Sequence, residues 1–181
     1  HTPMQLEQSA RYFPLVGVVV GGFSAVLLWL SLCVLPIPIA VAFSMLGSIL
    51  ITGAFHEDGL SDFVDGMGGG YTREKILAIM KDSHVGVYGV IAIVLALLVK
   101  YQALQALSNQ HALVPVAATL IAAHAVSRLM AVSIMLTQKY VRDDDSARAR
   151  PAAQGLSRIS FAIALMTGMA VIVFLYMAGA D

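Results

Sequence analysis

The sequence contains little charge and almost no cysteine. Only 12% of its 181 residues are Asp, Glu, Lys or Arg, and eleven basic residues balance eleven acidic ones. A neutral chain has no basic excess that would attract nucleic acid, so we expect no nucleic-acid partner. The single cysteine, Cys33, excludes a disulfide framework and a metal site made only of cysteines.

Long hydrophobic runs are abundant in the sequence. Hydrophobic residues make up 59% of the chain, and its mean hydropathy is +0.81. A helix needs about 20 apolar residues to cross about 30 Å of hydrocarbon, and five such runs occur, at residues 13–35, 37–55, 85–107, 113–136 and 159–178. We therefore expect an all-α, polytopic integral membrane bundle of about five transmembrane helices. It would form a single transmembrane domain over 1–181, a piece of a longer chain.

Glycines in the first run predict a tight helix contact. Gly17, Gly21 and Gly22 carry no side chain that would keep a neighbouring helix away. We expect another helix to approach the first run closely at these positions.

The charged residues gather in two of the connections between these runs. Nine of the eleven acids lie within 57–82 and 143–145, and most basic residues lie in the same two connections. The short connections 36–38 and 108–112 contain no Lys or Arg. By the positive-inside rule, the charged connections face the cytoplasm. This places an acidic active-site segment, 56–84, and a charged loop, 139–158, at the cytoplasmic side.

Three aspartates of the acidic segment fall on one helical face. At 100° per residue, Asp58, Asp62 and Asp65 lie within about 60° of one another if the segment is helical. Carboxylates this close repel each other unless a cation lies among them, and hard divalent ions take carboxylate oxygens. We therefore predict Mg²⁺, with Mn²⁺ as an alternative. No cluster of Cys and His argues for Zn²⁺.

A solvated loop between two membrane helices is the other interpretation of these acids. Carboxylates at a membrane edge are costly without a partner, so we favour the functional interpretation. Glu57 lies about 100° from Asp58 on a helix and either supports the metal ligands or is solvated. His56 is more often a packed interfacial histidine than a ligand.

A second, amphipathic helix is expected to follow. The glycines within 66–70 should end the acidic helix, and Thr72 should cap a short interfacial helix over 73–81. Lys81, Asp82 and Ser83 then bring a cation, a carboxylate and a hydroxyl to the same membrane edge. Lys81 is a candidate for binding phosphate and Asp82 for binding metal, although contact with lipid headgroups would also explain the basic residues.

The fourth run carries polar residues on one face. His124, Ser127 and Arg128 are spaced i, i+3 and i+4. Arg128 lies about 16 Å below the cytoplasmic end at 1.5 Å per residue, too deep for easy snorkelling. A salt bridge to an aspartate and a bidentate contact to a substrate phosphate both remain open for it. Lys100, in the third run, is expected to snorkel.

Several short segments form a recognisable combination. They are residues 13–17, 55–66, 79–83 with Gly86 and Gly89, and 127–128. Together they resemble the cobalamin synthase family, adenosylcobinamide-GDP ribazoletransferase. This chain has Glu57 where the family usually has Leu, and His84 where it usually has Arg. Family members also run further at both ends.

The resemblance implies a Mg²⁺-dependent displacement at a pyrophosphate. A ribose hydroxyl of α-ribazole, or of its 5′-phosphate, attacks the cobinamide-side phosphorus of adenosylcobinamide-GDP, and GMP leaves. The product is adenosylcobalamin or its 5′-phosphate. The resemblance also implies a multi-pass protein of the bacterial inner membrane, in contact with lipid, with its active site facing the cytoplasm. A homo-oligomer is left open.

Such a reaction needs a metal, a cation for the phosphoryl oxygens and a carboxylate that accepts the hydroxyl proton. The predicted metal ligands are Asp58, Asp62, Asp65 and Asp82. Asp62 and Asp82 are the predicted catalytic residues, and Lys81 and Arg128 the predicted phosphate-binding residues. Candidate supporting residues are Glu57, His56, Ser83 and His124. Spacing does not decide which carboxylate is the general base.

Two rival functions could also use these residues. A CDP-alcohol phosphotransferase also holds metal with aspartates on membrane helices, but the acids after Asp58 come too soon for its signature. An ion or solute transporter could use Asp62, Asp65, His124 and Arg128 as a coupling site. Against it, the acids cluster at one face of the membrane and the halves show no inverted repeat.

Overall fold

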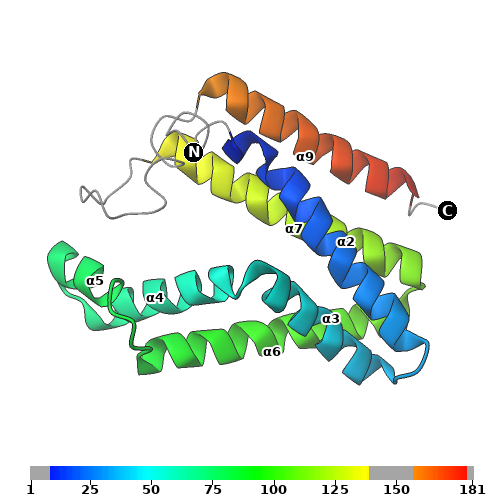
Figure 1. Ribbon diagram of the computed structural model, residues 1–181, viewed down its shortest axis with the longest axis horizontal. Coiled ribbons are helices and arrows are strands. Elements are labelled where there is room, and N and C mark those ends of the chain that lie inside the picture. The colour runs from blue at the N-terminus through cyan, green and yellow to red at the C-terminus, as the bar shows by residue number, and fades with distance from the viewer. Residues whose placement is uncertain (1–8, 139–156, 179–181) are drawn as a thin grey trace. The chain divides into compact units, whose positions relative to one another are not determined.

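The structure is a computed structural model, and it describes residues 9–138 and 157–178 (Figure 1). Within these ranges the chain is helical and contains no strand. The charged loop predicted at 139–158 lies almost entirely outside them. The elements are η1 (Ala10–Tyr12), α2 (Phe13–Leu32), α3 (Ile37–Thr52), α4 (Phe55–Gly69), α5 (Arg73–Ile79), α6 (Val87–Gln110), α7 (Leu113–Thr137) and α9 (Arg158–Ala178).

The predicted fold class is confirmed. Among the described residues, four helices are long and apolar enough to cross a membrane, and a fifth span results if the bent pair of α3 and α4 counts as one. The chain is therefore a polytopic helical membrane protein. Its described residues divide into two compact units, one within 1–26 and 112–181 and the other within 27–111.

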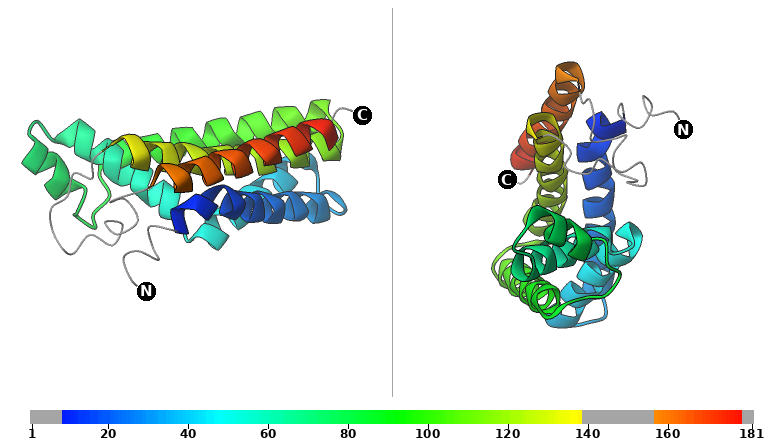
Figure 2. Two further views of the ribbon diagram at one scale, coloured as in Figure 1. Left: turned by 90° about the horizontal axis from the view of Figure 1, so that it is seen from above. Right: turned by 90° about the vertical axis from the view of Figure 1, so that its left-hand side faces the viewer.

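The first unit is built on α7 and α9, which lie side by side in Figure 1 and in the left view of Figure 2. Helix η1 packs on α9 as well. Small side chains allow this close packing. The buried core of the three elements consists of Ala10, Leu129, Val132 and Ala164.

The expected tight contact of the first run occurs within this unit. A Cβ atom on Gly17 would overlap the backbone of His124 and Ala125 in α7, and one on Gly21 would lie 2.6 Å from the Cα atom of Ile121. Backbone atoms cannot move aside, so both positions require glycine. The expectation was wrong for Gly22, which has open space around it.

The second unit contains α3, α4, α5 and α6. Helices α3 and α4 both pack along α6, and α5 folds back on α4 (Figure 1). Glycines of α4 make this possible. A Cβ atom on Gly66 would lie 2.7 Å from Met80, and one on Gly68 would lie 2.7 Å from the Tyr88 ring. The expectation that the glycines within 66–70 end the acidic helix is confirmed at the last of them, because α4 continues through Gly66 and Gly68, ends at Gly69 and has Gly70 as its C-cap.

The second apolar run does not form the single straight helix over 37–55 that the sequence predicts. Helix α3 has 16 residues and ends at Thr52, and the chain bends by 84° before α4 begins. Gly53 and Ala54 produce the bend because both have left-handed backbone conformations, with φ of 64° and 57°. The N–H of Ala54 donates to the carbonyl of Ile49 (2.9 Å), which closes the end of α3. Helix α4, with its acids, therefore leaves in a new direction.

The predicted cap of the short helix is confirmed. The hydroxyl of Thr72 accepts a hydrogen bond from the N–H of Lys75 at 3.3 Å. Helix α5 ends at Ile79, two residues before the predicted end, and none of its residues is buried.

Candidate functional site

The acidic segment is helical, as the shared face of its aspartates requires. Asp58 lies in the first turn of α4 and is exposed, and Asp62 follows one turn later and is half-buried. A carboxylate in the first turn interacts favourably with the helix dipole. The structure thus presents two carboxylates, one turn apart, on one accessible face of α4.

Asp65 has a different environment from these two residues. It is 7% exposed, and it reaches the N-terminus of α6. Its Oδ2 atom accepts the N–H of Gly86 (2.7 Å), and its Oδ1 atom accepts the N–H of Gly89 (2.8 Å). The first N–H groups of a helix have no partner within the helix, so Asp65 satisfies two of them from a neighbouring helix.

Two further polar atoms of α4 are buried without a hydrogen-bond partner in the described structure. They are Oε2 of Glu57 and Oγ of Ser61. Together with Asp65 these residues are spaced four apart, so they lie along one side of α4. A buried polar atom left without a partner costs about 1–3 kcal/mol. Glu57 and Ser61 are therefore places where the helix can still accept or donate a hydrogen bond.

The residues before α6 form an exposed turn. Lys81, Asp82 and Ser83 are all exposed, and the Oδ1 atom of Asp82 accepts the N–H of His84 (3.1 Å). The Nδ1 atom of His84 lies 2.6 Å from the same oxygen. This contact lowers the pKa of Asp82 and raises the pKa of His84. Sequence reasoning missed the pair, although an aspartate side chain in a turn commonly accepts the backbone N–H two residues further along.

The polar face predicted in the fourth run is present in α7. Arg128 is 8% exposed, and its Nη1 atom donates to Nδ1 of His124 (3.0 Å), to Oγ of Ser127 (3.0 Å) and to the His124 carbonyl (3.3 Å). A buried guanidinium needs such partners because desolvation of its charge is costly. Arg128 and the aspartates of α4 belong to different units. The predicted salt bridge between them stays a prediction.

The donor chemistry of α4 suits a hard divalent cation, although the predicted cluster is not assembled. Among residues 9–138 and 157–178, no three His, Cys, Asp or Glu side chains are grouped so that they could hold a metal ion. Asp58 and Asp62 still offer carboxylate oxygens on an accessible face, and Mg²⁺ commonly uses one or two carboxylates with water and phosphate. The ligand assignments of Asp65 and Asp82 stay predictions, as do the roles of Lys81, Ser83, His56, Glu57 and His124.

Lys100 has a partner that the sequence did not predict. Instead of snorkelling alone, its Nζ atom donates to Oγ of Ser48 in α3 (3.4 Å). Ser48 is 4% exposed and donates in turn to the carbonyl of Met45 (2.7 Å). This contact joins α3 to α6 through residues that lie far apart in the sequence.

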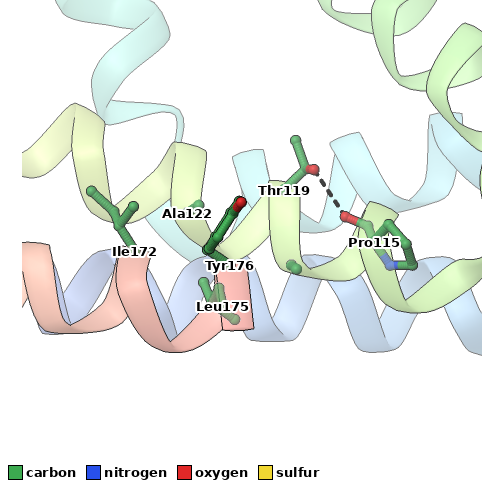
Figure 3. Close-up of a pocket in the computed structure, with 7 residues that line it drawn as sticks. Pro115, Thr119, Ala122, Ile172, Leu175 and Tyr176 are labelled. Atoms are coloured by element: carbon green, nitrogen blue, oxygen red, sulfur yellow. Dashed lines mark hydrogen bonds between the residues drawn. The ribbon is translucent and has the colours of Figure 1, made fainter. Parts of the chain in front are cut away.

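A groove of about 280 Å³ lies between α7 and α9 (Figure 3). Its walls are mainly apolar, and the hydroxyl of Thr119 is already bonded to the carbonyl of Pro115 (2.9 Å). None of the predicted site residues lines it. The groove therefore offers no phosphate or metal chemistry.

Comparison with known proteins identifies the family. A family model described as cobalamin-5-phosphate synthase matches residues 1–180, almost the whole chain. The chain belongs to this family. A relative from Shewanella sp. strain W3-18-1 is 46% identical over 171 residues, and one from Ralstonia nicotianae is 50% identical over 164 residues. Both relatives are named adenosylcobinamide-GDP ribazoletransferase. The family resemblance seen in the sequence is thus confirmed.

The matches cover this chain more fully than they cover the relatives. They span 94% and 90% of this chain, but only 65% of the Shewanella protein and 62% of the Ralstonia protein. This member of the cobalamin-5-phosphate synthase family therefore corresponds to less than two thirds of their length. No solved structure matches the chain.

Proposed function

We propose that the whole protein transfers the adenosylcobinamide-phosphate group of adenosylcobinamide-GDP to α-ribazole or its 5′-phosphate, a late step of cobalamin biosynthesis. The observation that carries this proposal is the family match over residues 1–180, together with relatives that bear the name of this activity. The two accessible carboxylates of α4 support it, because transfer at a pyrophosphate requires charge neutralisation.

The proposed reaction exchanges one phosphorus–oxygen bond for another. A ribose hydroxyl of the acceptor forms a bond to the cobinamide-side phosphorus, and the bond from that phosphorus to the bridging oxygen of the pyrophosphate breaks. GMP leaves with the electron pair of the broken bond, and the hydroxyl proton passes to a carboxylate. The products are adenosylcobalamin, or its 5′-phosphate, and GMP.

Asp58 and Asp62 are the residues that we propose as ligands of Mg²⁺, which would neutralise charge on the phosphoryl and leaving oxygens when bound. Asp82 either adds a further ligand or accepts the hydroxyl proton. The contact with His84 lowers the pKa of Asp82, so the carboxylate is ionised at neutral pH and is a weaker base than an ordinary aspartate. Lys81 and Arg128 would hold phosphoryl oxygens.

The proposed reaction also requires that the active site opens to the side of the membrane where its nucleotide substrate is present. The nucleotide donor is soluble, and the positive-inside rule puts the segment 56–84 at the cytoplasmic side. We therefore propose that the active site opens to the cytoplasm from the bacterial inner membrane.

The test is GMP release from adenosylcobinamide-GDP and α-ribazole by the full-length protein in lipid, with and without Mg²⁺. Asp62→Asn keeps the shape of the side chain and removes its charge, so metal-dependent turnover should fall by several orders of magnitude. Glu74→Gln makes the same change at an exposed acid of α5 and should leave turnover unchanged.

Two results would overturn parts of this proposal. Normal turnover by Asp62→Asn would refute the metal assignment while leaving the reaction in place. Absence of GMP release by the wild type, combined with ion flux in vesicles, would replace the transferase with a transporter.

A further inference from the structure

We propose that Asp65 is a positioning residue that fixes α4 against α6, and that it is not a ligand of the metal. The proposal rests on the proposed function, since it refines which carboxylates of α4 face the substrate. Asp65 would act on the reaction through the orientation of Asp58 and Asp62.

The first support is the use of both carboxylate oxygens. Each accepts a backbone N–H from the first turn of α6, at 2.7 and 2.8 Å, which are the short distances typical of charge-assisted hydrogen bonds. Gly86 is the N-cap of α6 and Gly89 lies three residues later, so the carboxylate caps the helix although it belongs to α4.

The second support is the pair of glycines that surround the carboxylate. A Cβ atom on Gly86 or on Gly89 would overlap Asp65, and a Cβ atom on Gly89 would also overlap Oγ of Ser61. The absence of side chains at both positions is what allows the carboxylate to reach the two N–H groups. A contact of this kind sets the distance between the two helices.

The third support is electrostatic. The N-terminus of a helix carries a partial positive charge of about half an elementary unit, which attracts anions and repels cations. A divalent cation on Asp65 would lie beside that positive charge and beside two N–H donors. Asp58 is exposed and Asp62 half-buried, and a cation bound by them would keep water on its other positions.

The consequence concerns the rotation of α4 about its own axis. Asp65 lies about 20° from Asp58 and about 60° from Asp62 around the helix. Once Asp65 is bonded to α6, the direction in which the other two carboxylates point is fixed. Enzymes lose about 100-fold in rate when a reacting group is misplaced by about 1 Å.

Carboxylate labelling of the wild-type protein tests this proposal without any substitution. The full-length protein in lipid is treated with a carbodiimide and an amine, with and without Mg²⁺, and the labelled acids are identified by mass spectrometry. We expect Asp65 to be protected equally in both conditions, and Asp58 and Asp62 to be protected only when Mg²⁺ is present. Labelling of Asp65 that Mg²⁺ suppresses would overturn the proposal.

The same experiment separates this proposal from the proposed function. If Mg²⁺ protects none of the three aspartates while Asp65 stays unlabelled, the metal assignment fails, and with it the claim that Asp65 positions metal ligands. Its bonds to α6 would then have a structural role only.

Substitutions that break the contact between Asp65 and α6 measure its effect on the rate of the reaction. Asp65→Asn presents an amide NH₂ to one N–H donor, and Gly89→Ala pushes the carboxylate away, so both should lower kcat about 100-fold. The affinity for Mn²⁺, measured by electron paramagnetic resonance, should change less than twofold in both. Because they break the same contact, the double variant should be no worse than either single one. Gly22→Ala, at a glycine with open space, serves as the matched control and should have wild-type kcat.

The opposite pattern would refute the positioning role. If Asp65→Asn weakens Mn²⁺ binding tenfold or more while Gly89→Ala leaves it unchanged, Asp65 is a ligand. If the two kcat losses multiply in the double variant, they do not arise from a shared contact.

Discussion

Two buried charges of this protein, Asp65 and Arg128, obtain their hydrogen bonds in different ways. Asp65 accepts two backbone N–H groups from another helix, more than twenty residues further along the chain. The Nη1 atom of Arg128 donates to His124 and Ser127, within one turn of its own helix. The first arrangement couples two helices, whereas these bonds of Arg128 stay within α7. Asp65 therefore holds one helix against another, and the proposed phosphate contact of Arg128 is what substitutions can test.

Among the substitutions that test this comparison, removal of the guanidinium should have the largest effect. Arg128→Met should lower kcat/KM for GMP release about 100-fold, equivalent to about 2.7 kcal/mol, because one donor to a phosphoryl oxygen is lost. Ser127→Ala removes only a hydrogen-bond partner of Arg128, so it should lower kcat/KM less than tenfold. If the folded Arg128→Met protein keeps its kcat/KM, Arg128 does not hold the substrate, and the comparison fails.

The next effect concerns the backbone contact beside His124. Gly17→Ala would place a methyl group against the backbone of α7, and overpacking of this kind costs about 1–3 kcal/mol. We expect a lower Tm in detergent for this variant, and an unchanged Tm for Gly22→Ala. Equal Tm values for both would show that α2 and α7 do not approach each other as closely as described.

A smaller effect is expected from the side of α4 that carries Asp65. Ser61→Ala removes a buried hydroxyl that has no hydrogen-bond partner among the described residues, so it should raise the free energy of unfolding by about 1 kcal/mol. Ser48→Ala removes a hydroxyl bonded to Met45 and Lys100 and should lower it by a similar amount. Thermal unfolding in detergent compares the two. A loss of stability in Ser61→Ala would mean that its hydroxyl is bonded after all.

The smallest effect is a titration at the exposed turn before α6. The contact with Asp82 raises the pKa of His84 above its ordinary value of 6.5 and lowers the pKa of Asp82 below 3.8. The contribution of His84 is complete below its unfolded pKa and is lost as the pH rises through its folded pKa. The contribution of Asp82 is present above its unfolded pKa and is lost as the pH falls through its folded pKa. Both contributions are therefore complete between the ordinary values of 3.8 and 6.5, and each is lost outside this range as the pH passes the folded pKa of its group.

Histidine NMR titration measures this directly. Asp82→Asn should return the pKa of His84 toward 6.5, since the carboxylate that holds the proton on the ring is gone. An unchanged pKa in this variant would show that the contact does not persist in solution.

Local patterns explain how much of the fold could be predicted. Apolar runs long enough to span a bilayer predicted the helices, because every backbone polar group in lipid must be bonded within a helix. Thr72 predicted the start of α5, since a hydroxyl before a helix accepts one of its first N–H groups. Gly17 and Gly21 predicted a close contact, although not with which helix.

The candidate site was predicted less completely. Helical periodicity correctly predicted that Asp58 and Asp62 share one face of α4. It also correctly predicted that the polar residues of α7 share one face of that helix. It could not show that the oxygens of Asp65 accept two N–H groups of α6, because helical angles contain no information about what lies opposite each side chain. The pair of Lys100 and Ser48 was missed for the same reason, since its members are 52 residues apart.

The sequence by itself determined that this chain is a membrane protein, which segments are helical, where its acids gather and to which family it belongs. Each of these properties depends on composition, on spacing within about one helical turn, or on short motifs. Only the tertiary structure decided that α3 and α4 meet at an 84° bend and that Asp65 reaches the N-terminus of α6. The bend depends on the left-handed backbone of Gly53 and Ala54, which the apolar pattern of the segment does not reveal. The contact of Asp65 depends on which backbone groups of a distant segment come within hydrogen-bond distance, and the packing of whole helices sets that distance.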